Sequence, residues 1–120
     1  MTGLELIEQL DELEYNQYDT KQKLGWLYQL DGQIYREVIE RHEGAPPMPS
    51  RYTTGNEELL IGEPYGEGIY ISYMLAQIAL FNGERARYNT QVISYNQQYD
   101  AWCADYNRRN LPKGARQFIF

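Results

Sequence analysis

Cysteine and histidine, the residue types on which most metal and nucleophilic sites depend, are almost missing from this 120-residue chain. It has one of each, Cys103 and His42. A single cysteine excludes an intramolecular disulfide and fits a reducing compartment. Zinc prefers cysteine and histidine ligands, so a zinc site here would need a set made almost wholly of carboxylates. The sequence therefore predicts no metal and no cofactor.

The same two residues give little support to catalysis. His42 is expected at the surface near the end of a helix, with a solvated side chain rather than a place in a catalytic triad. Cys103 lies in an aromatic helical stretch, where a small buried thiol is expected. Glu63, Glu67 and Glu84 could pair as acid and base, but glutamates are common at helix starts and on surfaces. We predict that the protein is not an enzyme and has no catalytic residue.

Long apolar runs and positive charge are also scarce. The longest nearly apolar stretch, residues 69–81, is shorter than the roughly 20 residues that a membrane-spanning helix needs. The first residues are acidic, whereas a signal peptide begins with basic residues and an apolar run. The net charge of −6 argues against binding nucleic acid by neutralising its phosphates. We therefore expect a cytoplasmic protein that binds neither a membrane nor a DNA sequence.

Tyrosine is the residue type in excess, with 12 tyrosines against 3 phenylalanines and 2 tryptophans. A tyrosine buries a large ring while its hydroxyl seeks water or a hydrogen-bonding partner. Two interpretations remain open. The tyrosines either complete the edge of a thin core or line a surface that binds other proteins.

Charge is unevenly distributed along the chain. Residues 1–20 contain acidic side chains and no lysine or arginine, whereas residues 101–120 are mainly basic. These ends are either two solvated surfaces or complementary surfaces of neighbouring copies. In the second case the contact is heterologous, and a repeated heterologous contact can close into a ring.

Two amphipathic helices are predicted in the first 42 residues. Thr2 and Glu5 have the spacing of a capping box, and the leucines that follow recur at helical spacing as far as about Glu14. Asp19 and Gln22 mark a second helix start, and the second helix is expected to reach about residue 42. Its apolar stripe contains Leu24, Leu27, Leu30, Ile34 and Val38.

Two further helices are predicted near the C-terminus. Residues 69–81 are apolar nearly all round, which is typical of a central helix covered on several sides, and Pro64 is expected in its first turn. The dipeptide Asn82-Gly83 predicts its end and a tight turn. Residues 85–107 are predicted to form the last helix, with an aromatic stripe that packs on the central helix. The stripe consists of Tyr88, Val92, Tyr95, Tyr99, Trp102 and Tyr106.

Between the second and third predicted helices, residues 43–68 read as a long loop. The prolines at 46, 47 and 49 stop the helix before them, because proline lacks an N–H donor and restricts its neighbour. The apolar run 59–61 is either an extended piece fixed to the core or a brief strand. Residues 51–56 are either a binding tip or a mobile part of the loop.

The predicted fold class is therefore all-α. We expect a compact bundle of three main helices plus a short N-terminal helix, with a long loop between the second and third helices. Residues 1–120 are expected to form a single helical domain, with a helical core at about 1–110 and an extended C-terminal tail at 111–120. The tail ends in three large apolar residues that must dock on this domain or on a neighbouring subunit.

Short motifs rich in tyrosine and asparagine run through most of the chain. They are Trp26-Leu27, residues 34–39, Leu59-Leu60, Glu63-Pro64-Tyr65, residues 70–78, Asn82-Gly83-Glu84, Tyr88-Asn89, Tyr95-Asn96, Tyr99, Tyr106-Asn107-Arg108 and Pro112. Together they resemble small head–tail connector (adaptor) proteins from phages and prophages of Gram-positive bacteria. The sequence departs from that pattern after Tyr65, where Gly66-Glu67-Gly68-Ile69 replaces an expected acidic residue and leucine.

The resemblance implies a structural virion protein that works by assembly. Such adaptors form a homo-oligomeric ring, typically dodecameric, beneath the portal protein, and receive a stopper or tail-completion protein below. Genomic DNA passes through the channel without sequence-specific binding, and an acidic channel surface would let it slide. The implied location is the head–tail junction of the virion, with the host cytoplasm as the place of assembly.

On this resemblance we expect contacts with a subunit or partner through the loop and the C-terminal region. The expected residues are Arg51, Tyr52, Arg108, Arg109, Arg116, Phe118, Ile119 and Phe120. A structural role in the tight turn is expected for Asn82, Gly83, Glu84 and Asn89. Two other functions remain open: a prophage or bacterial helical accessory protein that binds a regulator or an enzyme, and another small virion protein of the tail or of the capsid decoration.

Overall fold

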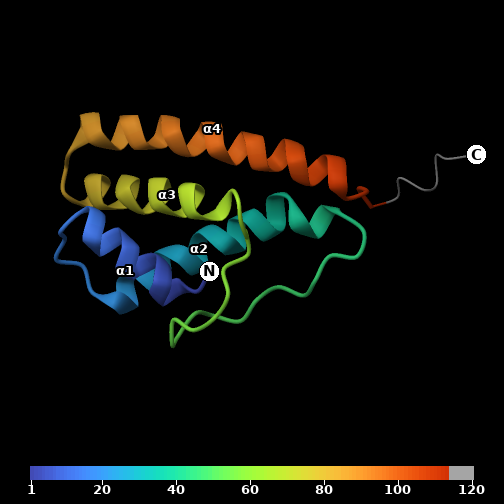
Figure 1. Cartoon of the computed structure of the whole chain (residues 1–120), viewed down its shortest axis with the longest axis horizontal. Coiled ribbons are helices and arrows are strands. Elements are labelled where there is room, and N and C mark those ends of the chain that lie inside the picture. Colours follow the sequence, from blue (N-terminus) through green and yellow to red (C-terminus); the bar gives the residue numbers. More distant parts are fainter. Residues whose placement is uncertain (114–120) are drawn as a thin grey trace, which may run out of the picture.

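The computed structural model describes residues 1–113 of the chain. In this part the protein is helical, with two isolated β-bridges and no strand. The elements are α1 (Gly3–Leu13), α2 (Thr20–Glu37), a 3-10 turn η1 (Ile39–Arg41), α3 (Gly66–Phe81) and α4 (Arg85–Arg109). Figure 1 shows α4 along one edge, α3 beside it, and α1 and α2 on the other side of α3. The predicted all-α class is confirmed.

The start of α1 is as its sequence predicts. Thr2 Oγ1 accepts a hydrogen bond from Glu5 N, and Glu5 Oε1 accepts one from Thr2 N, which completes the capping box. The two remaining amides of the first turn donate to the loop, from Leu4 N to Gly55 O at 2.9 Å and from Gly3 N to the carbonyl of residue 57 at 3.3 Å. Every free amide at this helix end is therefore bonded, and the loop is fastened to α1.

The start of α2 is also confirmed, because Asp19 Oδ1 accepts a hydrogen bond from Gln22 N at 2.7 Å. Its predicted end at residue 42 is wrong, since α2 stops at Glu37 and η1 follows. At this junction the backbone of Val38 leaves helical values, with φ −125° and ψ −62°, and Val38 and Ile39 are both buried.

The segment between η1 and α3 contains no helix. Glu58 pairs with Thr2 in an isolated bridge, and Leu59 N donates to Met1 O at 3.0 Å. Leu59 and Ile61 are buried in the core. The run 59–61 is thus an extended piece fixed to the core rather than a strand.

Helix α3 packs against all three other helices, as expected of a central element. It begins at Gly66, three residues before the predicted start, and Pro64 lies in the preceding turn rather than in the helix. Both glycines of the unexpected Gly66-Glu67-Gly68 sequence are sites of close approach. A Cβ at Gly66 would overlap the carbonyl oxygen of Ile61, and one at Gly68 would overlap the Gln98 side chain from α4.

A tight turn joins α3 to α4. Gly83 has a φ of +75°, in the left-handed region that glycine adopts without strain. Helix α4 then runs to Arg109, two residues past its predicted end. It packs on α3 along one side, and Trp102 is its only buried residue in the described part of the chain.

Candidate functional site

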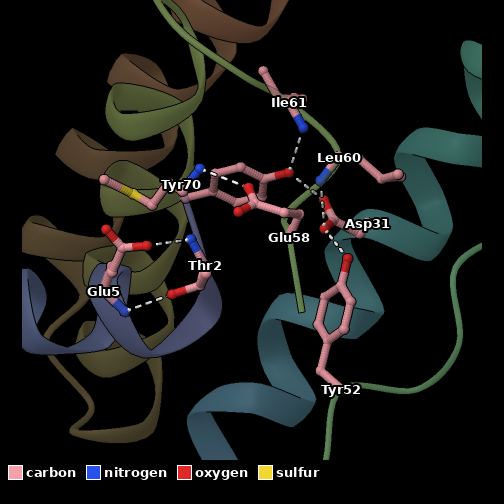
Figure 2. Close-up of polar contacts among 9 residues, drawn as sticks. Thr2, Glu5, Asp31, Tyr52, Glu58, Leu60, Ile61 and Tyr70 are labelled. Atoms are coloured by element: carbon pink, nitrogen blue, oxygen red, sulfur yellow. Dashed lines mark hydrogen bonds and ion pairs between the residues drawn. The ribbon is translucent and has the colours of Figure 1, made fainter. Parts of the chain in front are cut away.

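The most constrained polar group of the molecule is the carboxylate of Asp31 on α2, which is completely buried. Tyr52 OH donates to its Oδ2 at 2.5 Å, Leu60 N donates to the same oxygen at 3.2 Å, and Tyr70 OH donates to Oδ1. Tyr70 OH in turn accepts a hydrogen bond from Ile61 N at 2.9 Å. Figure 2 shows these groups converging on Asp31 of α2 from α3 and from the loop.

This network, which we call the Asp31 hub (Asp31, Tyr52, Leu60, Ile61 and Tyr70), is a structural fastening. Burial raises the pKa of Asp31 above its ordinary value, against the hydrogen bonds from the two tyrosines and from Leu60 N that lower it. Burial also raises the pKa of Tyr70 well above its ordinary value, so its hydroxyl stays a donor. Because each Asp31 oxygen already accepts from the protein, the carboxylate has no access to a substrate.

Sequence reasoning did not find the Asp31 hub, although one signal for it was present. Asp31 lies four residues after Leu27 and three before Ile34, which places it on the apolar stripe of α2. A carboxylate on a buried stripe needs donors, because an unpaired buried charge is expensive. The two tyrosines that supply them lie 21 and 39 residues away along the chain.

Burial distinguishes two singled-out residues from their expected surroundings. Tyr52, predicted at an interface, is 5% exposed in the single chain and its hydroxyl belongs to the Asp31 hub. The prediction for His42 is wrong. His42 was expected in solvent, but it is also 5% exposed. Its Nδ1 lies 2.6 Å from Val38 O and its Nε2 lies 2.8 Å from Asn107 Oδ1, so the ring joins η1 to α4.

The remaining predicted interface residues fall in three places. Arg51 is exposed on the loop. Arg108 and Arg109 are exposed in the last turn of α4, where both pair with Asp105 one turn earlier. Salt bridges between such exposed groups contribute little to stability, about 1 kcal/mol or less. Arg116, Phe118, Ile119 and Phe120 lie outside the described residues.

The predicted turn residues lie at the junction of α3 and α4. Asn82 caps α3, and its Oδ1 accepts a hydrogen bond from Tyr18 OH at 2.7 Å, which ties the turn to the loop before α2. Glu84 N donates to Ala79 O at 2.8 Å, and the Glu84 carboxylate pairs with Arg87. Asn89 is exposed one turn into α4 and beside this turn.

The aromatic stripe of α4 meets α3 at Tyr95, whose ring centroid lies 5.8 Å from that of Tyr73 on α3, and its rings also pack on one another along α4. Ring centroids are 5.5 Å apart between Tyr95 and Tyr99, 5.9 Å between Tyr99 and Trp102, and 5.2 Å between Trp102 and Tyr106. The tyrosines of this series are half-buried, and burial raises the pKa of Tyr95 and Tyr99. Their hydroxyls are therefore protonated donors at any ordinary pH, held on rigid rings at the protein surface.

Part of this stripe lines a groove of about 310 Å³ between α3 and α4, here called the tyrosine groove. Gln77 Nε2 donates to Tyr73 OH at 2.7 Å in its wall. The hydroxyls of Tyr88 and Tyr95 have no hydrogen-bond partner among residues 1–113. The lining consists of Tyr73, Ala76, Gln77, Tyr88, Val92, Tyr95 and Asn96.

A second exposed feature lies on α2. The proline segment, residues 46–49, is held there by tyrosine hydroxyls, from Tyr35 OH to Pro46 O at 2.7 Å and from Tyr28 OH to Pro49 O at 3.5 Å. A Cβ on Gly32, between the two tyrosines on the helix, would come within 3.2 Å of the Met48 side chain. The segment is therefore fixed in place, while Pro46, Pro47 and Met48 stay exposed.

Chemical groups of other kinds are few in the described part of the chain. Among residues 1–113, no three His, Cys, Asp or Glu side chains gather as ligands of one metal ion would. Cys103 is half-buried beside Tyr99, and burial raises the pKa of its thiol. Such a thiol is less reactive than an exposed one at neutral pH.

Comparison with protein-family models, with curated proteins and with solved structures finds no match for this chain. In the part of the chain that the structure describes, no helix is both long and apolar enough to cross a bilayer.

Proposed function

We propose that the protein is a structural virion protein, a head–tail connector (adaptor) of a tailed phage or prophage that assembles into a homo-oligomeric ring. The observation that carries the proposal is the one-sided packing of α4. This helix has 25 residues, yet only Trp102 is buried in the described chain. A long helix that contacts its own fold along one side has the other side available to neighbouring subunits.

The half-buried tyrosines of α4 also support the proposal. Its tyrosine rings are rigid and half-exposed, and tyrosine is enriched in the buried centres of protein–protein interfaces. Its outer face also carries Ile93, which is 59% exposed. The tyrosine excess is consistent with both interpretations of the sequence, a core edge and a binding surface. The same rings border the core and line the tyrosine groove.

The motifs that resemble phage connectors supply the rest of the proposal. The partners are further copies of the chain, the portal protein on one side and a stopper or tail-completion protein on the other. Genomic DNA passes through the ring without sequence-specific contacts. The protein acts at the head–tail junction of the virion and assembles in the host cytoplasm, without a membrane, a cofactor or an enzymatic activity.

The experiment is a measurement of oligomeric state. Native mass spectrometry and light scattering over a concentration series, with and without a purified phage portal protein, should give a closed ring. A chain that stays monomeric at high concentration and with the portal protein would contradict the proposal. Binding to a host regulator in place of the portal would favour the accessory-protein alternative.

A second test concerns the C-terminal residues. We propose that residues 114–120 contact the next protein in the assembly, because a run of three large apolar side chains needs a partner surface. Deleting them should leave the circular dichroism spectrum and unfolding of the monomer unchanged and abolish assembly. Normal assembly of the truncated chain would show that this assignment is wrong.

A further inference from the structure

Two exposed features of the chain are chemically complementary: the tyrosine groove and the proline segment. Grooves lined by aromatic side chains bind proline-rich peptides in the extended polyproline conformation, as tyrosine hydroxyls donate to the peptide carbonyls. We propose that the proline segment of one copy docks in the tyrosine groove of the next. This inference rests on the proposed ring and specifies which surfaces of neighbouring subunits meet.

The proline segment has the features of such a ligand. Proline fixes its own φ and keeps the residue before it extended, which restrains residues 45–49. The carbonyls of Pro46 and Pro49, three residues apart, both accept from tyrosines of α2, and this spacing matches the three residues per turn of a polyproline helix. The intervening carbonyls of Pro47 and Met48 have no hydrogen-bond partner among residues 1–113. Because the segment is already ordered, docking would lose little conformational entropy.

The tyrosine groove supplies hydrogen-bond donors for the free carbonyls of the proline segment. Tyr88 OH, Tyr95 OH and the Asn96 amide can donate hydrogen bonds, and the rings and Val92 provide an apolar floor. The lengths agree, since Tyr88 to Asp100 spans about 18 Å along α4. Residues 46–51 span about 16 Å in a polyproline conformation.

Charge fixes the direction of docking. Arg51 follows the proline segment, is exposed, and forms no salt bridge in the described chain. Asp100 lies one turn after Asn96, is also exposed, and likewise forms no salt bridge there. With Pro47 near Tyr88 and Tyr95, Arg51 of one copy reaches Asp100 of the next. Opposite charges at the end of an interface select register and orientation.

The positions of the two features make this contact head to tail. Figure 1 shows the segment after η1 running along the side of α2 that faces away from α4, while α4 forms the opposite edge of the molecule. The proline segment of one copy therefore cannot reach the groove of the same copy. Two copies related by a twofold axis cannot fill both of their grooves with each other's segments. A repeated contact between different surfaces generates a ring or a filament.

A charge-swap experiment tests the contact. Arg51→Asp and Asp100→Arg should each raise the concentration at which half the chains are assembled by tenfold or more. The double variant Arg51→Asp/Asp100→Arg should recover assembly to within about threefold of the wild type, since a reversed pair is still a pair. Gln97→Arg, exposed on the outer face of α4, is the control and should assemble normally. Unfolding of each monomer checks that the fold is intact.

Mixing provides an independent readout. Pro46→Ala/Pro47→Ala removes the ligand, and Asn96→Arg blocks the groove. Equal amounts of the two variants should form 1:1 dimers and nothing larger, because only one intact contact remains per pair.

Each result decides between the proposals. If the wild type assembles and the single charge variants assemble equally well, the contact is wrong while the ring stands. A wild type that never assembles contradicts the ring and this contact together. Such a monomer can still be titrated with a peptide of residues 44–51 and followed by NMR. If the peptide changes chemical shifts only in the tyrosine groove, the occupant is a proline-rich segment of another protein rather than a second copy.

Discussion

The two sides of α3 differ in how they satisfy their polar groups. On one side, α1, α2 and residues 52–61 enclose the Asp31 hub, and we call α1, α2, α3 and this segment the frame. On the other side, α4 lies on α3 with half-buried tyrosines, and the hydroxyls of Tyr88 and Tyr95 are without partners in the described chain. The polar groups of the Asp31 hub are therefore bonded inside the frame, whereas many polar groups of α4 face the solvent.

This difference separates stability from contact. Among residues 1–113, no buried side-chain nitrogen or oxygen lacks a hydrogen bond. The charged groups that achieve this within the core belong to the frame, namely Asp31 and Lys23, whose Nζ lies 2.6 Å from Asp11 Oδ1. Substitutions in the frame should therefore change the free energy of unfolding, whereas substitutions on the outer face of α4 should change association.

The largest expected effect comes from removing the centre of the hub. Asp31→Ala leaves two tyrosine hydroxyls and the Leu60 amide buried without an acceptor, and should lower the free energy of unfolding by about 3 kcal/mol or more. Asp31→Asn keeps one oxygen acceptor and should lose roughly half as much. Urea unfolding followed by circular dichroism measures both. Equal stability of Asp31→Ala and the wild type would contradict the role assigned to the hub.

The two tyrosines of the hub offer a finer comparison. Tyr70→Phe removes the donor to Asp31 and the acceptor of Ile61 N, whereas Tyr52→Phe removes a donor alone. The first should lower the free energy of unfolding by about 2 kcal/mol and the second by about 1 kcal/mol. The same urea titration compares them. A larger loss for Tyr52→Phe would mean that the loop, rather than α3, is the main anchor.

Two carboxylates of the frame should respond to pH in opposite senses. Hydrogen bonds from backbone amides, first its own and then those of Thr53, Thr54 and Gly55, lower the pKa of Glu57 from 4.5 to about 2. Its contribution to stability is therefore present above pH 4.5 and lost as the pH falls toward 2. Asp31 has a raised pKa, so its contribution is full below its ordinary value of 3.8 and falls as the pH rises through the raised value.

Unfolding at several pH values separates the two. Between pH 7 and about pH 3, the stability advantage of the wild type over Glu57→Gln should shrink, and its stability relative to Asp31→Asn should improve. Parallel pH curves for the wild type and both variants would show that neither carboxylate differs between the folded and unfolded states.

The smallest effect on stability is expected on the outer face of α4. Ile93 is 59% exposed and is replaced at little cost, so Ile93→Ser should change the free energy of unfolding of the monomer by about 0.5 kcal/mol or less. Thermal unfolding at a concentration below assembly measures this. A loss comparable to that of Tyr70→Phe would mean that α4 is as tightly integrated as the frame.

Local patterns predicted the helices well. The capping residues Thr2 and Asp19 and the turn at Gly83 each act within a few residues, so their spacing alone indicated three helix boundaries. The end of α2 was missed, because the stop signals visible in the sequence, Gly44 and the prolines after it, come later than the break at Val38. The start of α3 was also missed, because Gly66 and Gly68 are needed for close approach of Ile61 and Gln98. Those two residues lie elsewhere in the sequence.

The candidate surfaces were harder to predict from sequence. Tyr52 and Arg51 are neighbours in the loop, yet one is buried and the other exposed. Only the distant carboxylate of Asp31 distinguishes them, and no local pattern reports it. The tyrosine groove forms only where α3 and α4 lie side by side. The excess of tyrosine therefore indicated the kind of side chain that lines it but not where it lies. Likewise the prolines predicted the end of a helix, but not that α2 would hold them at its surface.

The central claim is that the frame maintains the fold while α4 and the proline segment make contacts with neighbouring copies. Hydrogen exchange followed by mass spectrometry, on dilute and on assembled protein, tests it most directly. We predict that assembly slows exchange in peptides covering residues 88–100 and 45–52 and leaves α1 and residues 55–61 unchanged. Protection gained in α1 or residues 55–61, with α4 unchanged on assembly, would contradict the account.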